Sequence, residues 1–262
     1  MNPFVQELEG RRLLSATLTS GVLDIEGSKA NNNITVSLSA DGTTLTVTES
    51  IARRGHKASA GTTTTFAAAD VSSIVANGGA GNDNIVFKAL GSTAFTTPAV
   101  IDGGAGNDWI RAAGGADSIS GGDGDDKIEA GDGADTVNGG DGDDKINGGA
   151  GADLLNGDDG DDDLTGGADA DTMNGGDGDD VFRAAGDSAV DTIDGGADSA
   201  ETGEDDQDTA VVDATDTVTD VVSNATIGSA DDLHGACPGS GRGGAFDFGT
   251  SGFTGFSTRR HR

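Results

Sequence analysis

Through residues 103–183 an apolar side chain recurs at every ninth position, without a gap or a shift of register. Two of the nine-residue units, GGDGDDKIE at 121–129 and GGDGDDKIN at 139–147, are nearly identical. Because neighbouring side chains of a strand point to opposite faces, the last three residues of each unit predict a very short strand with its apolar residue inward. The first six residues, rich in glycine and aspartate, predict a turn. The apolar positions are Ile110, Ile119, Ile128, Val137, Ile146, Leu155, Leu164, Met173 and Phe182.

A second period appears at the fifth position of the units, where a polar residue and alanine alternate strictly. The series is Asn107, Ala116, Asp125, Ala134, Asp143, Ala152, Asp161, Ala170 and Asp179. The structural repeat is therefore eighteen residues long. This length predicts a flattened coil in which each unit contributes one strand and one turn, so that successive turns fall on opposite edges. The fold class is all-β, a solenoid of short parallel strands.

The sixth position is aspartate in all nine units, and a separate copy, GGAGNDNIV at 78–86, has Asp83 in the same place. The eighteen-residue period assigns these residues to two edges. We define the first edge by Asp108, Asp126, Asp144, Asp162 and Asp180, and the second edge by Asp117, Asp135, Asp153 and Asp171. Position three adds Asp123, Asp141, Asp159 and Asp177 to the first edge, so we expect that edge to bind cations, or a cationic surface, more readily.

Carboxylates beside glycine carbonyl groups form a hard, oxygen-only ligand set, which favours calcium over zinc or copper. The array resembles the RTX, or hemolysin-type, calcium-binding nonapeptide repeat family. The resemblance implies a parallel β-roll that binds several Ca²⁺ ions between its turns and folds as it binds them. The expected ligands are the carboxylates of Asp83, Asp108, Asp117, Asp126, Asp135, Asp144, Asp153, Asp162, Asp171 and Asp180, with the backbone carbonyls of Gly104, Gly106, Gly122, Gly124, Gly140, Gly142, Gly149, Gly151, Gly176 and Gly178.

Several units depart from the pattern. Ala112, Ala113 and Ala130 replace leading glycines, Asp158 replaces a second-position glycine and Asp169 a fourth-position glycine, which predicts weak or strained turns. After Phe182 the register requires two extra residues to reach Asp191, which is therefore an uncertain ligand, and the acidic loop at 201–208 has no metal-site spacing. Upstream, residues 27–35 form a faded copy with Asn32 at the sixth position. We interpret this copy as a relic or a capping turn that holds no ion.

The remaining sequence predicts strands around the array. Ile34, Val36 and Leu38 alternate with polar residues before Asp41-Gly42, and Leu45 and Val47 follow, which indicates a hairpin. We expect the following organisation: a sorting or frayed segment at 1–15, a β-rich capping region at 16–102, the β-roll at 103–194, an acidic loop and C-terminal strands at 195–232, and a flexible, disordered Gly-rich basic tail at 233–262.

Charge narrows the choice of partners. The chain has 46 acidic and 15 basic residues, a net charge of −31, which disfavours nucleic acid and anionic membranes. No apolar run approaches the roughly 18 residues of a membrane-spanning helix. Cys237 is the only cysteine, so the chain has no internal disulfide. Calcium ions are the expected partners, and cell-surface or matrix components are possible ones.

No sequence signature of catalysis is present. The three histidines, His56, His234 and His261, lie outside the array and share no motif, and paired carboxylates are a product of the repeat itself. An EF-hand, the nearest rival for calcium, would need flanking amphipathic helices. We therefore expect a non-enzymatic, extracellular β-roll, a structural or adhesive module at a bacterial cell surface. Two alternatives stay open: the C-terminal remnant or accessory part of a secreted RTX exoenzyme or toxin, and a disordered acidic polymer that buffers calcium.

Overall fold

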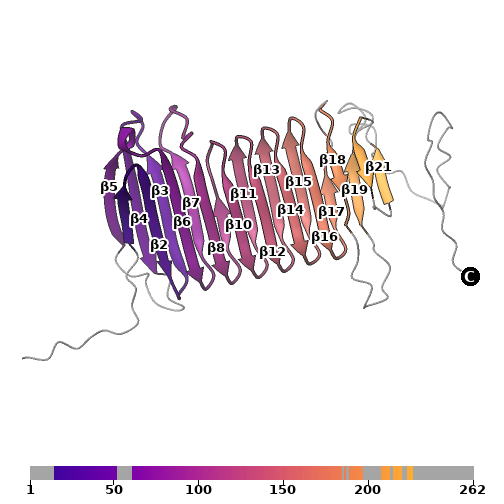
Figure 1. Cartoon of the computed structure of the whole chain (residues 1–262), viewed down its shortest axis with the longest axis horizontal. Helices are drawn as coiled ribbons and strands as arrows, with labels where there is room; N and C mark the ends of the chain where they lie inside the picture. Colours follow the sequence, from indigo (N-terminus) through magenta and orange to yellow (C-terminus); the bar gives the residue numbers. More distant parts are fainter. Residues whose placement is uncertain are drawn as a thin grey trace, which may run out of the picture. The chain divides into compact units, whose positions relative to one another are not determined.

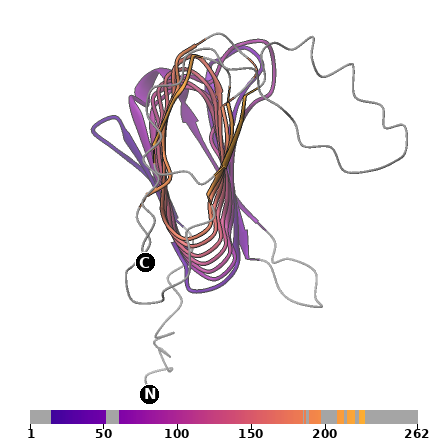
Figure 2. The same ribbon diagram turned by 90° about the vertical axis from the view of Figure 1, so that its right-hand side faces the viewer.

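The computed structural model describes residues 15–51, 61–184, 186, 189–196, 208–212, 215–219 and 223–226. Its strands form two sheets that face each other (Figures 1 and 2). Sheet A contains, in spatial order, β1 (Ser15–Thr19), β2 (Val22–Ser28), β6 (Ser73–Ala80), β8 (Ala99–Ala105), β10 (Ser118–Asp123), β12 (Thr136–Asp141), β14 (Leu154–Asp159), β16 (Thr172–Asp177), β18 (Thr192–Asp194) and β20 (Thr217–Thr219). Sheet B contains β21 (Ser223–Thr226), β19 (Thr209–Val212), β17 (Val181–Arg183), β15 (Asp163–Ala168), β13 (Lys145–Ala150), β11 (Lys127–Asp132), β9 (Trp109–Arg111), β7 (Asn84–Ala89), β3 (Asn32–Leu38), β4 (Thr44–Ile51) and β5 (Thr62–Ala67).

The chain crosses from one sheet to the other after every strand of the array, and each strand pairs in parallel with the strand two further along the sequence. Ile128 pairs with Ile146 in sheet B, and Ile119 pairs with Val137 in sheet A. Both offsets are eighteen residues, so two units make one coil. The predicted parallel β-roll with alternating edges is confirmed. Figure 2 shows the coils along their stacking direction as flattened loops.

The strands are longer than the sequence predicted. β11, β12, β13, β14, β15 and β16 each have six residues, and each extends from position seven of one unit through position three of the next. The expectation of a three-residue strand and a six-residue turn was therefore wrong. Glycines at position two continue the ladder, as in the pairs Gly122–Gly140 and Gly131–Gly149, and only positions four to six turn the chain.

Close stacking of the coils explains why position two is glycine. Gly122 has a φ of 115°, and a Cβ at this residue would collide with the carbonyl oxygen of Gly104 in the preceding coil. The predicted strain is present at two departures from the pattern: Asp158 has a φ of 78° and Asp169 a φ of 77°. Such left-handed conformations are costly for residues that have a Cβ.

The core of the array consists of the position-eight side chains, which stack on one another from coil to coil along each sheet. All nine are at most 2% exposed, from Ile110 to Phe182, as the ninefold apolar pattern predicted. Leu23, Ile25, Ile74 and Ile101 extend the same core into sheet A before the array. Two apolar columns thus run through the coils and bind each coil to the next.

Antiparallel strands stand at the N-terminal end of both sheets. β3 and β4 form the predicted hairpin, in which Val36 pairs with Val47 and Leu38 with Leu45. β5 adds to β4, and β1 adds to β2, also in antiparallel fashion. At the tip of the hairpin, hydrogen bonds from Ser39 and Thr43 lower the pKa of Asp41 to about 2.

Short parallel strands continue the roll after the array. β18, β19, β20 and β21 extend the two sheets in the order of the sequence. The described residues include no helix long and apolar enough to cross a membrane. The predicted N-terminal segment, apart from Ser15, the tail at 233–262 and residues 201–207 of the acidic loop lie outside the described residues.

We expect Ile146→Ala to lower the free energy of unfolding of the calcium-loaded roll by about 2–5 kcal/mol, because it opens a cavity in a column whose neighbours cannot collapse into it. Guanidinium denaturation in saturating calcium measures this loss. The neighbouring exposed variant Asn147→Ala should change stability by less than about 0.5 kcal/mol. Equal effects of the two substitutions would contradict the assigned core.

Candidate metal sites at the two edges of the roll

The position-six aspartates of the first edge form a continuous hydrogen-bonded column. The backbone N–H of Asp108 donates to Asp126 Oδ1 at 2.6 Å, and the N–H of Asp126 donates to Asp144 Oδ1 at 2.7 Å. The same bond links Asp144 to Asp162 and Asp162 to Asp180, each at 2.8 Å. Each carboxylate thus fixes the turn of the coil before it. The predicted grouping of these residues on one edge is confirmed.

The second edge repeats this arrangement. The N–H of Asp117 donates to Asp135 Oδ1 at 2.8 Å, and the series continues to Asp153 and Asp171 at 2.9 Å. Ala99, which precedes the array, donates its N–H to Asp117 Oδ1 at 2.7 Å. Both edges therefore use one geometry, in which the donor and the acceptor are separated by one coil.

Both columns extend beyond the regular array. On the first edge, Asn32 and Asp83 precede Asp108, and Asp208 follows Asp180. On the second edge, Asp191 accepts from the N–H of Asp171 at 2.8 Å and donates its own N–H to Asp216. Asp191 is thus in register despite the two extra residues before it. Sequence reasoning missed Asp208 and Asp216, although the Asp-Thr-apolar signature of 135–137 and 171–173 recurs at 208–210 and 216–218.

The second oxygen of these carboxylates is buried and faces other acceptors. Asp126 is 3% exposed, and its Oδ2 has no hydrogen-bond partner. A Cβ on Gly121 would collide with both Asp126 Oδ2 and the carbonyl oxygen of Gly139 in the next coil, so these two oxygens flank the same point. The corresponding Oδ2 atoms without a hydrogen-bond partner belong to Asp83, Asp108, Asp135, Asp144, Asp153 and Asp162. Buried oxygens that face one another without a hydrogen between them are costly unless a cation lies among them.

Burial raises the pKa of these carboxyls well above the usual value of 3.8. The pKa of Asp126 rises to about 7 and that of Asp162 to about 8, in both cases chiefly through loss of solvent. The backbone hydrogen bond lowers each value, and the negative charge of neighbouring aspartates raises it further. On the second edge, burial raises the pKa of Asp117 to about 6 and that of Asp153 to about 7.

The basic residues of the array do not neutralise the edges. All four of them, Arg111, Lys127, Lys145 and Arg183, lie on strands of sheet B. Their acidic partners, Glu129 and Asp163, lie on the same sheet. The first edge has in addition an outer row of exposed position-five carboxylates, in which the N–H of Asp161 donates to Asp143 Oδ1 at 3.1 Å. The edges therefore require positive charge that the basic residues of the array do not supply.

Comparison with known families assigns the ion. The family model of the RTX calcium-binding nonapeptide repeat matches residues 100–128, 120–155, 129–164, 148–182 and 156–189. Residues 100–189 are an array of RTX repeats. The comparison with curated proteins finds no match to the chain. The RTX array is thus a calcium-binding β-roll, as its sequence indicated.

The residues of the RTX array fit calcium. Within the described parts of the chain, no three His, Cys, Asp or Glu side chains converge on one point. The buried Oδ2 atoms instead lie beside backbone carbonyls, and carboxylate and carbonyl oxygens together are the ligands that calcium prefers. The predicted carbonyl groups of position two lie near the end of a strand and those of position four in the turn that follows it. A Cβ on Gly122 would collide with Gly104 O, and one on Gly124 would lie close to Gly106 O. Their role as ligands stays a prediction. When bound, calcium supplies the positive charge that lets the buried carboxylates stay ionised.

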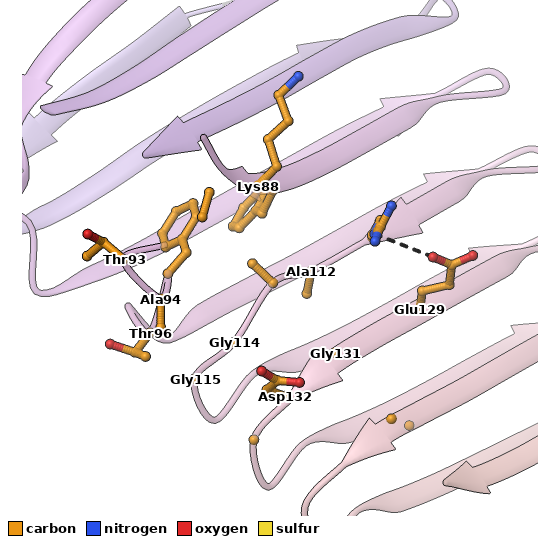
Figure 3. Close-up of a pocket in the computed structure, with 18 of the residues that line it drawn as sticks. Lys88, Thr93, Ala94, Thr96, Ala112, Gly114, Gly115, Glu129, Gly131 and Asp132 are labelled. Atoms are coloured by element: carbon orange, nitrogen blue, oxygen red, sulfur yellow. Dashed lines mark ion pairs between the residues drawn. The ribbon is translucent and has the colours of Figure 1, made fainter. Parts of the chain in front are cut away.

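The unit with two leading alanines lies beside a groove of about 760 Å³ (Figure 3). The loop that follows β7 forms one wall, and Phe95 in this loop stacks on Phe87 with ring centroids 5.9 Å apart. Ala112 is buried against this cluster, at 3% exposed. The backbone of the loop lies close to Gly114 and Gly115: a Cβ on Gly114 would press on the carbonyl oxygen of Phe95, and one on Gly115 on that of Thr96. This turn therefore packs on the backbone of the loop, whereas a turn such as that at Gly122 stacks on a glycine of the preceding coil.

The raised pKa values predict how pH affects the calcium-free roll. Protons bind the folded state more tightly than the unfolded chain, so protonation stabilises the fold fully below about pH 4 and ceases to do so as pH rises through about 6–8. In excess EDTA we expect β structure by circular dichroism at about pH 4.5 and its loss by about pH 8.5. Calcium should restore it at the higher pH. An EDTA spectrum that is unchanged across this range would contradict the prediction.

Asp126→Asn should weaken calcium binding by roughly tenfold or more, because it removes a buried ligand charge but keeps Oδ1 as the acceptor for Asp108. Asp125→Asn removes the same charge from an exposed side chain of the same turn and serves as the control. Isothermal titration calorimetry measures the affinity and the number of ions. If the control loses as much affinity as Asp126→Asn, general charge rather than the column determines binding.

Proposed function

We propose that this protein is an extracellular module whose calcium-folded β-roll acts as a structural or adhesive element at the bacterial cell surface, without catalysis. The observation that carries the proposal is the pair of buried carboxylate columns, in which Oδ2 atoms such as those of Asp126 and Asp144 have no hydrogen-bond partner. These columns make the roll dependent on a divalent cation. A fold that depends on calcium is useful where calcium is plentiful.

The calcium concentration supports a location outside the cell. Extracellular calcium-binding modules have dissociation constants of about 10⁻⁴–10⁻³ M, and cytosolic free calcium is far lower. The net charge of −31 adds to the effect, because the metal-free chain repels itself and stays expanded. On this proposal the chain is exported in an extended form and folds when it meets calcium.

A structural or adhesive role agrees with the surfaces of the roll. The coils expose regular rows of side chains, for example Ser118, Thr136, Leu154 and Thr172 on sheet A and the acidic rows of the first edge. Rows of this kind offer one repeated contact to a polymer or a mineral surface, and divalent ions can bridge them to other acidic surfaces. The module would thus gain strength from many weak contacts.

A calcium titration of the purified chain, followed by far-ultraviolet circular dichroism, tests the folding part of the proposal. We expect a cooperative gain of β signal at about 10⁻⁴–10⁻³ M calcium and none at equal magnesium, because magnesium dehydrates reluctantly and demands octahedral geometry. A disordered spectrum that calcium leaves unchanged would support the acidic-polymer alternative.

Protease treatment of intact producing cells tests the location. We expect the protein on the outer surface, resistant to protease in calcium and degraded after an EDTA wash, since the unfolded roll exposes its backbone. A cytosolic marker protein should stay intact in both conditions and so report on cell integrity. Recovery of this protein with the cytosolic marker would refute the extracellular role.

A further inference from the structure

The first turn of the first edge differs from all later turns because Asn32 stands at its sixth position. Asn32 is 1% exposed, and its backbone N–H donates to Asp83 Oδ1 at 2.6 Å, as the aspartates do. Its side chain, however, carries hydrogens. Nδ2 lies 3.0 Å from Asp83 Oδ1, 3.1 Å from Gly78 O and 3.4 Å from Ser28 O, and it also contacts Ala30 O.

Three of the four oxygens around Nδ2 stand at positions that supply predicted calcium ligands in the later turns: the carboxylate of Asp83 and the carbonyls of Ser28 and Ala30. Ser28 and Ala30 occupy positions two and four of the faded unit 27–35, and Gly78 occupies position one of the next coil. In the later turns the atom that corresponds to Nδ2 is an aspartate Oδ2. Asp126 Oδ2, for example, lies beside the carbonyl of Gly139, which is again position one of the next coil. The same point is thus surrounded by acceptors in both kinds of turn, but only Asn32 brings donors to it.

An amide group is a poor match to so many oxygens. It has two hydrogens, whereas four oxygens lie within 3.4 Å of Nδ2. The oxygens are therefore arranged as a coordination shell rather than as partners for one NH₂ group. Asn32 Oδ1 is already used, because Ser28 Oγ donates to it at 2.8 Å.

We propose that the Asn32 amide takes the place of a calcium ion, so that the first coil folds without metal and serves as a template for the calcium-dependent coils. A corollary is that one substitution, Asn32→Asp, converts this turn into a calcium site. The proposal rests on the calcium-binding role of the later turns. The segment contributes fully buried side chains, Leu23, Ile25 and Ile34, to the N-terminal part of the apolar core.

Hydrogen exchange read by mass spectrometry, on the full chain in EDTA and in calcium, tests the proposal. In the unmodified protein, peptides within 22–38 should stay protected in EDTA, whereas peptides within 118–177 should need calcium. Asn32→Asp should lose protection of 22–38 in EDTA by at least about tenfold, because a second carboxylate then faces Asp83 and the carbonyl oxygens in place of the amide donor. Calcium should restore it, and calorimetry should count one ion more than in the unmodified protein. Asn32→Ala should lose protection in both conditions.

Asn31→Asp is the matched control, because it adds the same charge at an exposed side chain one residue away. It should leave both the protection and the ion count unchanged. The proposal is overturned if Asn32→Asp keeps its protection in EDTA, if calcium fails to restore it, or if Asn31→Asp behaves in the same way. If the later turns do not bind calcium, calcium will fail to protect the peptides within 118–177, which is a different result. In that case, the loss of protection in EDTA caused by Asn32→Asp would still show whether the Asn32 amide stabilises the first coil.

Discussion

The roll depends on one interaction, the hydrogen bond from the backbone N–H of a position-six residue to the carboxylate of the next coil. It aligns the coils, because the bond from Asp126 to Asp144 forms only in the eighteen-residue register that also pairs Ile128 with Ile146. It also directs the second carboxylate oxygen inward against carbonyl groups. Register, burial and the demand for a cation are therefore consequences of the same contact. A chain that forms this bond repeatedly accumulates buried negative charge, and bound calcium neutralises that charge.

Periodicity made the main features predictable from sequence. The ninefold apolar pattern identified the core, and the alternation at position five separated the two edges. The length of the strands was not predictable in the same way. Glycines such as Gly122 have a positive φ, which suggests a turn, yet they pair with glycines of the neighbouring coils. The absence of a Cβ allows the backbone of the preceding coil to approach closely at this residue. Close stacking of glycine on glycine is a tertiary effect that no single unit reveals.

The ends of the columns were missed for a related reason. A search in steps of nine loses Asp208 and Asp216, because the offsets from Asp180 and Asp191 are 28 and 25 residues. The fold tolerates such insertions, since a longer loop between strands does not move the strands that it connects. The local signature of aspartate, threonine and an apolar residue recurs within the chain where the spacing does not. A search for this short signature therefore identifies column residues that a search by nine-residue spacing misses.

At the N-terminal end of the roll, a neutral amide stands where the later coils have a carboxylate. Antiparallel β1, β4 and β5 terminate the parallel stacking at that end. The first carboxylate of the column, Asp83, is met by both the backbone N–H and the amide of Asn32. Each later coil brings a carboxylate to the backbone N–H of the coil before it. A metal-independent first coil thus gives folding a starting point and a direction, and the ions are needed only where carboxylate follows carboxylate.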